Sequence, residues 1–346
     1  MIGQFLILNA LVTFVAALPA IIPRASTCNG RAELCGRSYG NTTFLMSHDS
    51  YAISNNPVIL SRNQAVDLTA QMNLGVRALQ AQSHMKDGAL HFCHTSCDLF
   101  DGGLVVNYLK TVKSFMDSHP NDVFTFLFTN PENASPKNVW APLFEQAGLA
   151  SLAYVPPHLP MKASEWPTLG QMIQSGKRLV VFMDYNSNTA EVPYILPEFD
   201  HIWEPPFNSI DSSFPCRVDR ISGPLSSQDH MFMINHNLDV KVFPFRQAKR
   251  EANPGFWDSI TSAIGGAIED TKNTIENGIN QGKDTLSEVL IPDLIHLPIT
   301  NGVPSILADS NGCAPFSGGK ATSFVMLDFV DVGQGMKAVD ILNGFR

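Results

Sequence analysis

Two histidines in the first third of the chain each follow a short apolar run, and as a pair they could perform acid–base chemistry. His48, beside Asp49, follows residues 43–47, and His94 follows residues 89–93. Cleavage of a phosphodiester needs a neutral imidazole to take a proton from the attacking hydroxyl and an imidazolium to protonate the leaving oxygen. A lone histidine at the end of a strand is usually structural, so the hypothesis depends on both residues.

More polar residues stand where other apolar runs end, and they extend the candidate site. They are Gln80, Gln82, Asn130, Asp184, Tyr185, His236 and Asp328. We expect Asp328 to orient His48, and Asp184 with Tyr185 to hold a polar headgroup. Asn130 and His236 could line the pocket. The alternative for each is a satisfied side chain in a loop or at a strand end.

Short buried strands with helical segments between them must bring these residues together. The strands are expected over residues 43–47, 76–82, 123–129, 179–184, 231–234 and 324–328, where apolar, β-branched or aromatic side chains predominate. Residues 103–118 and 138–147 have helical spacing. This alternation predicts βα units and a parallel sheet. In a βα barrel, the carboxyl ends of the strands converge on one mouth, where the chemistry takes place.

Residues 246–290 do not follow this alternation. Within them, apolar residues of the segment 256–290 recur about every 3.67 positions, so that Trp257, Ile268 and Ile279 are spaced by elevens. This period keeps an apolar stripe on one side of a long helix. We expect an amphipathic helical insertion that covers the flank of the barrel, and a helix lying on a lipid surface is the alternative.

The chain begins like a secreted protein. Residues 5–18 form an apolar run that is too short to span a membrane, and small residues follow it. We predict a signal peptide over residues 1–20, cleaved after Ala17 or Ala20, and one domain over residues 21–346. An N-terminal core helix is the alternative interpretation of the apolar run.

The cysteines agree with an extracellular location. Six cysteines fit three disulfides in an oxidising compartment. The short loops favour Cys28–Cys35 and Cys93–Cys97, which leaves Cys216 to pair with Cys313. A zinc site formed by Cys93, Cys97 and the intervening His94 is the alternative. Asn41 and Asn133 begin glycan acceptor patterns, which fit secretion as well.

Composition narrows the class of protein. The chain has 346 residues, of which 44% are hydrophobic and 16% charged, so it is globular with an ample interior. Its 23 Lys and Arg against 32 Asp and Glu give a net charge of −9, which argues against binding to nucleic acid. We expect a soluble monomer without a cofactor, whose membrane contact, if any, is peripheral and uses residues 256–290.

Three motifs carry a resemblance to a known family. In order and approximate spacing, residues 44–50, 75–82 and 90–94 look like the X-domain core of phosphatidylinositol-specific phospholipases C. The chain is more closely similar to secreted phospholipase C-like phosphodiesterases of fungi. The resemblance implies a distorted TIM-type (β/α)8 barrel, and the segment 256–290 lies outside it.

The resemblance also implies roles for single residues. His48 would act as the general base and His94 as the general acid, and Asp49 matches a position where an Asp orients the acid histidine. The alternative for Asp49 is a helix N-cap or turn residue. Gln80 and Gln82 stand where calcium-dependent relatives carry carboxylates and metal-free relatives carry an Asp and an Arg. Calcium is therefore disfavoured, and the metal-free mechanism loses its positive clamp.

Arg77 is the one nearby candidate for that clamp. It begins its predicted strand, far from the rim, so an ion pair at the base of the barrel is the alternative to phosphate contact.

These observations support three functional hypotheses. The first is a secreted phosphoric diester hydrolase or lyase that uses His48 and His94 without a required metal, acting on a phosphoinositide-type lipid or a soluble phosphodiester. The second is a weakly active or inactive relative that binds a headgroup or glycan, as Gln80 and Gln82 suggest. The third is a lipid-surface protein that acts through residues 256–290.

Overall fold

The computed structural model describes residues 25–56, 59, 61–242 and 289–345. Its strands are β1 (Phe44–Ser47), β2 (Ala78–Lys86), β3 (Ala89–Cys93), β4 (Asp101–Leu104), β5 (Phe124–Thr129), β6 (Leu179–Met183), β7 (Ile195–Pro197), β8 (Ile202–Trp203), β9 (Met231–Asn235), β10 (Asp239–Val242), β11 (Val289–Pro292) and β12 (Phe324–Leu327). The six strands predicted from apolar runs correspond to β1, β2, β5, β6, β9 and β12.

Eight parallel strands form a curled sheet that is nearly a closed barrel. In chain order, β1 pairs with β2, β2 with β5, β5 with β6 and β6 with β7. On the other side, β8 pairs with β9, β9 with β12, and β12 returns to β1. Within the described residues, no ladder joins β7 to β8. The predicted distorted TIM-type barrel is therefore confirmed, and the opening lies between its two shortest strands.

Alternation along the strands fills the barrel and covers its outside. Phe44 and Met46 belong to the inner cluster with Phe182, Met233 and other barrel residues, whereas Leu45 packs in the outer cluster with the helices. Since successive side chains of a strand point to opposite faces, His48 continues the inward series of β1. The same register determines which strand-end residues reach the mouth.

Helices cover the outer face. They are α1 (Leu68–Asn73), α2 (Val105–Ser118), α3 (Ala141–Gln146), α4 (Leu169–Gln174), α8 (Leu297–Thr300), α9 (Val303–Cys313) and α10 (Gly335–Leu342). The predicted helix over residues 103–118 is confirmed as α2, whose buried face includes Tyr108, Val112 and Phe115. The second predicted helix corresponds to a π-helical turn, Pro136–Trp140, followed by α3.

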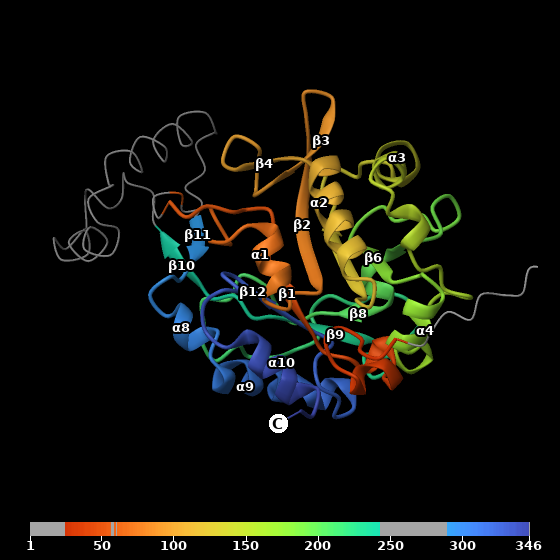
Figure 1. The fold of residues 1–346 in the computed structure, drawn as a ribbon. Coiled ribbons are helices and arrows are strands. Elements are labelled where there is room, and N and C mark those ends of the chain that lie inside the picture. Colours follow the sequence, from red (N-terminus) through yellow and green to blue (C-terminus); the bar gives the residue numbers. More distant parts are fainter. Residues whose placement is uncertain (1–24, 57–58, 60, 243–288, 346) are drawn as a thin grey trace, which may run out of the picture.

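Two antiparallel additions extend the barrel. β2 continues past the parallel sheet and pairs with β3, which pairs with β4, and this hairpin projects at the top of Figure 1. β10 pairs with β11, so that the backbones of Val242 and Val289 are neighbours in a two-stranded ribbon. The predicted helical insertion, residues 246–290, lies almost entirely outside the described residues, as does the predicted signal peptide.

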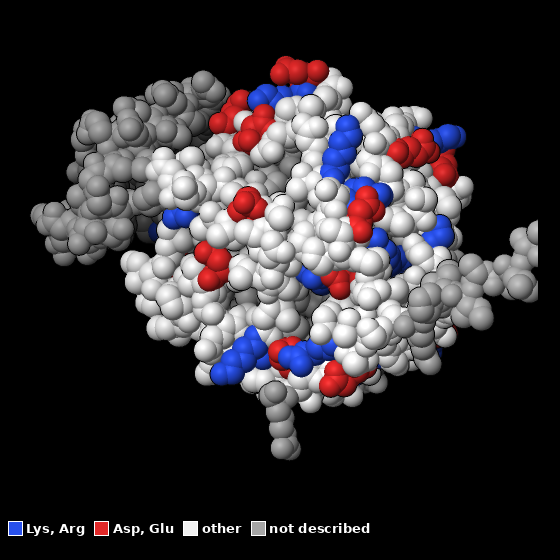
Figure 2. All heavy atoms as spheres, viewed as in Figure 1, with Lys and Arg blue, Asp and Glu red and all other residues white. Residues whose placement is uncertain are grey.

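The three predicted disulfides, Cys28–Cys35, Cys93–Cys97 and Cys216–Cys313, are confirmed. In the part of the chain that the structure describes, no helix is long and apolar enough to span a bilayer. On the face shown in Figure 2, acidic and basic side chains are interspersed over a mostly uncharged surface.

Candidate active site

His48 lies directly after the carboxyl end of β1, and a hydrogen bond at its Nδ1 fixes the orientation of the ring. Its Nδ1 lies 2.8 Å from Asp328 Oδ1, just past the end of the neighbouring strand β12. A carboxylate accepts hydrogen bonds, so Nδ1 carries the hydrogen and Nε2 is the atom that remains for chemistry. The imidazole is 19% exposed and thus reaches solvent from a largely buried position.

His94 reaches the same place from the loop after β3. Its Nδ1 lies 2.6 Å from the carbonyl oxygen of Ser61, and a carbonyl can only accept a hydrogen bond. Nε2 is therefore the free ring nitrogen here too. The imidazole is 21% exposed, and the Cys93–Cys97 disulfide closes the tight loop that contains it.

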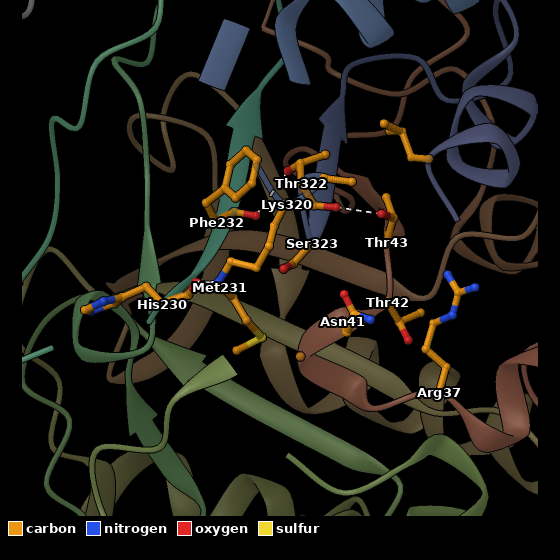
Figure 3. Close-up of a pocket in the computed structure, with 13 residues that line it drawn as sticks. Arg37, Asn41, Thr42, Thr43, His230, Met231, Phe232, Lys320, Thr322 and Ser323 are labelled. Atoms are coloured by element: carbon orange, nitrogen blue, oxygen red, sulfur yellow. Dashed lines mark hydrogen bonds between the residues drawn. The ribbon is translucent and has the colours of Figure 1, made fainter. Parts of the chain in front are cut away.

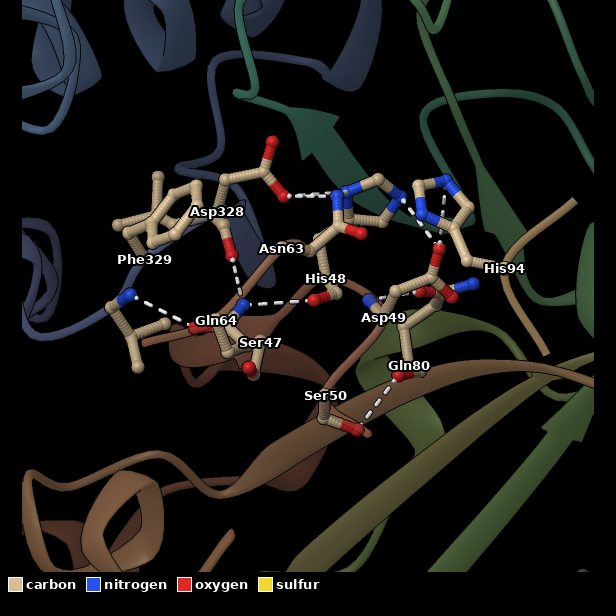
Figure 4. Close-up of polar contacts among 12 residues, drawn as sticks. Ser47, His48, Asp49, Ser50, Asn63, Gln64, Gln80, His94, Asp328 and Phe329 are labelled. Carbon is tan, nitrogen blue, oxygen red and sulfur yellow. Dashed lines mark hydrogen bonds and ion pairs between the residues drawn. The ribbon is translucent and has the colours of Figure 1, made fainter. Parts of the chain in front are cut away.

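Asp49 lies between the two imidazoles (Figure 4). Its Oδ2 is 3.8 Å from His48 Nε2 and 3.6 Å from His94 Nε2, and its side chain is 4% exposed. Asp49 has a left-handed φ of 34°, and the backbone N–H of Gln82 donates to its Oδ1 over 3.2 Å. Asp49 therefore lies in the turn after β1, as the alternative of a turn residue expects, and not at a helix N-terminus, and its carboxylate faces both histidines.

The two glutamines at the mouth use their amide oxygens within the site. Gln80 Oε1 accepts from the Asp49 backbone N–H over 2.7 Å, and Gln80 Nε2 donates to Thr129 Oγ1 over 3.2 Å. Gln82 Oε1 accepts from the Thr95 backbone N–H over 3.0 Å. Both residues therefore shape the turns that carry Asp49 and His94. Each of these oxygens is neutral and already accepts a backbone N–H group, which disfavours a calcium ion here.

Carboxylates dominate the electrostatics around His48. Burial opposes the charged imidazolium, but Asp328, Asp49 and Asp239 together raise the pKa of His48 to about 9. Burial and the nearby Asp328 raise the pKa of Asp239 to about 7, although His48 opposes this shift. His48 is consequently an imidazolium at neutral pH and a strong base once its proton has left.

A second acidic cluster occupies the mouth beside the barrel opening. It comprises Asp184 after β6, Glu198 after β7 and Glu204 after β8, with Arg220 and Asn235. Arg220 pairs with Glu204, and Asn235 Nδ2 donates to Glu204 Oε2 over 3.0 Å. Burial and the adjacent Glu204 raise the pKa of the Glu198 carboxyl. This side of the mouth therefore holds buried carboxylates together with the guanidinium of Arg220.

Arg77 does not reach the mouth, so its assignment to phosphate binding is wrong. It precedes β2, at the amino end of the barrel, and its guanidinium pairs with Asp122 and donates to the carbonyls of Met72 and Val76. Arg77 instead forms the structural ion pair at the base of the barrel that was the alternative.

His236 is also wrongly assigned to the pocket. It is one residue past the inward-facing Asn235, so it points outward, and it is fully buried. Its Nδ1 lies 2.7 Å from Asp309 Oδ2, and its Nε2 lies 2.8 Å from the carbonyl of Thr300. His236 therefore connects β9 to the helices that cover it.

Asn130, Asp184 and Tyr185 support a loop at the mouth. Asn130 bonds in both directions with the backbone of Ala134, and its Nδ2 also donates to the Tyr185 carbonyl, so its side chain holds the loop after β5. Asp184 Oδ1 accepts from the backbone N–H groups of Asn130 and Tyr185. Burial nevertheless raises the pKa of Asp184 to about 6, and the Tyr185 side chain is 52% exposed.

Several residues of the mouth were not predicted from the sequence. They are Asn63, Thr129, Glu198, Glu204, Arg220, Asn235 and Asp239. The inward register of β5 and β9 would have selected Thr129 and Asn235. Asn63 comes from a loop that carries no periodic signal, and β7 and β8 are too short to indicate Glu198 and Glu204.

Two other features contribute no group to the proposed chemistry. Among described residues, the group with metal-ligand spacing is His91, Cys93 and Asp101, but Cys93 is in a disulfide and offers no thiolate, which counts against the zinc alternative. A small hollow lies at the amino ends of β1, β9 and β12, where Thr43, Met231 and Ser323 line it (Figure 3). It is at the opposite end of the strands from the histidines.

Comparison with known sequences gives one family and several relatives. The family model described as PI-PLC X 1 matches residues 34–274. An uncharacterized secreted protein of Arthroderma benhamiae is 42% identical over 217 residues, 62% of this chain and 48% of that protein, so the chain matches about half its length. The PI-PLC X domain-containing protein 1 of the same fungus is 38% identical over 244 residues, 69% of this chain and 78% of that protein. The name of the first relative describes that protein as secreted, which agrees with the secretion predicted for this chain.

Comparison with solved structures bears on the fold. A phosphatidylinositol-specific phospholipase C from Staphylococcus aureus that carries pentafluoro-Phe superimposes with a TM-score of 0.50. The match covers 90% of this chain and 94% of that chain at 11% sequence identity. At this identity the likeness concerns the fold alone, and it agrees with the open barrel.

Proposed function

The chain belongs to the PI-PLC X domain family, and from that premise we propose that it is a secreted phosphoric diester hydrolase that uses His48 and His94 as an acid–base pair. One observation carries the proposal. The Nε2 atoms of the two imidazoles lie 3.8 and 3.6 Å from the same oxygen of Asp49, while each Nδ1 is tied to an acceptor behind it.

In the proposed reaction, neutral His48 takes the proton of a hydroxyl whose oxygen attacks phosphorus. The bond between phosphorus and the leaving oxygen breaks, and His94 donates its Nε2 proton to that oxygen. His48 is then the imidazolium and His94 is neutral. Asp328 stabilises the charge that His48 acquires, and Asp49 keeps both rings turned toward the phosphorus. If the first product is a cyclic phosphate, water can open it by the reverse proton movements.

The two imidazoles also supply the positive charge that the phosphate needs. Gln80 and Gln82 replace the charged residues of relatives, and Arg77 is at the base of the barrel. Of the described residues, Arg220 is the guanidinium of the second acidic cluster, and it is already paired with Glu204. The two histidines therefore provide both the proton transfers and the positive charge. Because they can offset little negative charge, this arrangement favours a monoanionic diester over a substrate with further phosphates.

The residues do not fit a calcium ion at the position used by calcium-dependent relatives. Two amides stand where carboxylates would be required, and their oxygens accept backbone N–H groups at 2.7 and 3.0 Å. We therefore propose turnover that resists chelation. The substrate is proposed to be phosphatidylinositol, a glycosylated inositol lipid or a soluble glycerophosphodiester.

A second candidate is a headgroup-binding protein with little or no turnover. The neutral Gln80 and Gln82, which stand where relatives carry charged residues, favour it. Gln80 would then have a structural task, since both ends of its amide are bonded within the mouth.

The experiment that tests the proposal measures phosphodiesterase turnover of the secreted protein on phosphatidylinositol, its glycosylated forms and soluble diesters, with and without EDTA. We expect EDTA-resistant turnover that His48→Ala and His94→Ala each reduce by about 10²- to 10⁴-fold. His158→Ala is the control, because His158 is 56% exposed and pairs with Glu165 away from the mouth. Folded protein that binds a headgroup without turnover would instead support the second candidate.

A further inference from the structure

One tripeptide in the loop after β1 touches both halves of the proposed acid–base pair. The carbonyl of Ser61 accepts from His94 Nδ1 over 2.6 Å. Two residues later, Asn63 Nδ2 donates to Asp328 Oδ1 over 2.8 Å, and this is the oxygen that His48 Nδ1 contacts. Asn63 Nδ2 is itself 3.3 Å from His48 Nδ1 (Figure 4).

The backbone holds Asn63 firmly in this position. Its N–H donates to the Ala52 carbonyl over 2.9 Å, and its carbonyl accepts from the Phe329 N–H over 2.7 Å. Its side chain is buried, with 2% of the residue exposed. The adjacent Arg62 lies over the Phe329 ring at 5.0 Å. The amide of Asn63 therefore has one stable direction, toward the carboxylate of Asp328.

Resting on the proposed function, we propose that Asn63 is a positioning residue that governs when His48 releases its proton. Its amide donates to the oxygen of Asp328 that also holds the His48 ring. While His48 is an imidazolium, that oxygen has a charged partner. After the proton has left, the carboxylate depends on neutral donors, and Asn63 then stabilises the basic state of the pair.

The charged groups around His48 explain why the neutral Asn63 amide can matter for its protonation. The titratable groups that face His48 are Asp328 after β12, Asp49 after β1 and Asp239 of β10, with His94 across Asp49. Despite burial, which opposes it, the three carboxylates raise the pKa of His48 to about 9. All three favour the imidazolium, whereas the Asn63 amide favours the neutral base. In the same loop, burial lowers the pKa of the adjacent Arg62, and the charge of Asp331 opposes this shift.

The test measures the titration of His48 by NMR in the full chain. Asn63→Leu keeps the volume and removes the donor, and we expect the His48 titration to move up by about half to one pH unit. The acid limb of kcat/KM should move with it, which lowers kcat/KM at pH 7 by about 3- to 10-fold. Asn63→Ala should shift both in the same direction but less, because water can replace the amide. Arg62→Lys, which keeps the charge beside Phe329, should leave both unchanged.

The outcomes separate this proposal from a structural role and from the proposed function. If folded Asn63→Leu and Asn63→Ala proteins lose thermal stability while the His48 titration stays in place or falls, the proposal is wrong. If the titration moves up but neither wild type nor variant turns over any diester, Asn63 acts as proposed and the enzymatic function fails. A rise of the titration together with the acid limb supports both.

Discussion

At the scale of single residues, the chemistry depends on the hydrogen bonds that fix which nitrogen of each imidazole carries hydrogen. Asp328 and the Ser61 carbonyl each receive an Nδ1 hydrogen, so both Nε2 atoms face Asp49 and the space above it. A substrate phosphate that enters there meets one potential acid and one potential base without any ring having to turn.

The raised pKa of His48 leads to a prediction about pH. A base must be neutral to act, and His48 is charged below about pH 9, so kcat/KM should rise with pH until that value. Asp328→Asn removes a carboxylate that favours the imidazolium. The acid limb should then move down by about one unit or more, toward the ordinary histidine value, while the maximal rate falls because the ring is held less well. A pH–rate profile of both proteins checks this, and an acid limb that stays near pH 9 in Asp328→Asn would count against the assignment.

The sequence predicted those site residues that have a reactive side chain and also lie at the end of a recognisable strand. His48, Asp49, His94 and Asp328 were selected as strand-end residues, and the structure brings them together. His236 was selected by type, but the alternation along β9 directs Asn235 inward and His236 outward. Asn63 reaches the site from an irregular loop and Asp239 from the first position of the short strand β10, and both placements depend on long-range contacts that a local pattern does not encode.

At the scale of elements, two disulfides differ in what they hold in place. Cys216–Cys313 joins the long segment after β8 to the end of α9, across 97 residues of sequence. Cys93–Cys97 closes a loop of only 4 residues in sequence separation, and His94 is inside it. The first bridge constrains the unfolded chain strongly, and the second mainly fixes the position of one imidazole.

Removal of the first bridge should therefore lower mainly the stability, and removal of the second should lower mainly the turnover. Replacing Cys216 and Cys313 by Ala should lower the free energy of unfolding by about 2–4 kcal/mol and leave turnover at low temperature nearly unchanged. Replacing Cys93 and Cys97 by Ala should cost little stability but lower kcat by about tenfold, because His94 loses its fixed position. Urea unfolding and steady-state kinetics on the same samples check both halves. Equal effects of the two double variants on kcat would refute the distinction.

The elements themselves were predictable to the extent that they are long or continuously apolar. β1, β2, β5, β6, β9 and β12 are buried runs of four or more residues, and α2 has a clear apolar face. β7 and β8 have 3 and 2 residues, so they become strands only through their neighbours in the barrel. Tertiary pairing outweighs local propensity at such short lengths.

At the scale of the whole molecule, the eight barrel strands that the structure describes all lie outside residues 243–288. β10 and β11 pair so that the backbones of Val242 and Val289 are neighbours, and a hairpin turn can join residues in that position. The two described residues that flank this segment are therefore neighbours, one of them at the end of the strand that begins with Asp239.

Replacement of residues 243–288 by an Asn-Gly turn should give a folded protein with turnover of a soluble diester within about threefold of wild type. Liposome flotation of both proteins tests the alternative that the amphipathic segment binds lipid surfaces, and loss of flotation in the shortened protein would support that alternative. A shortened protein that fails to fold, or that folds and has lost its turnover of the soluble diester, would contradict the independence of the barrel.

The central claim, that His48 is the base and His94 the acid of one reaction, is tested most directly by the choice of leaving group. We would compare kcat/KM for a diester with an alkyl alcohol leaving group and for one with 4-nitrophenol, which departs without a proton. With the 4-nitrophenol diester, the account predicts a kcat/KM of His94→Ala within about tenfold of wild type. For His48→Ala it predicts a kcat/KM that stays lower than wild type by about 10²-fold or more. Recovery of His48→Ala instead, or equal deficits of both variants on both diesters, would contradict it.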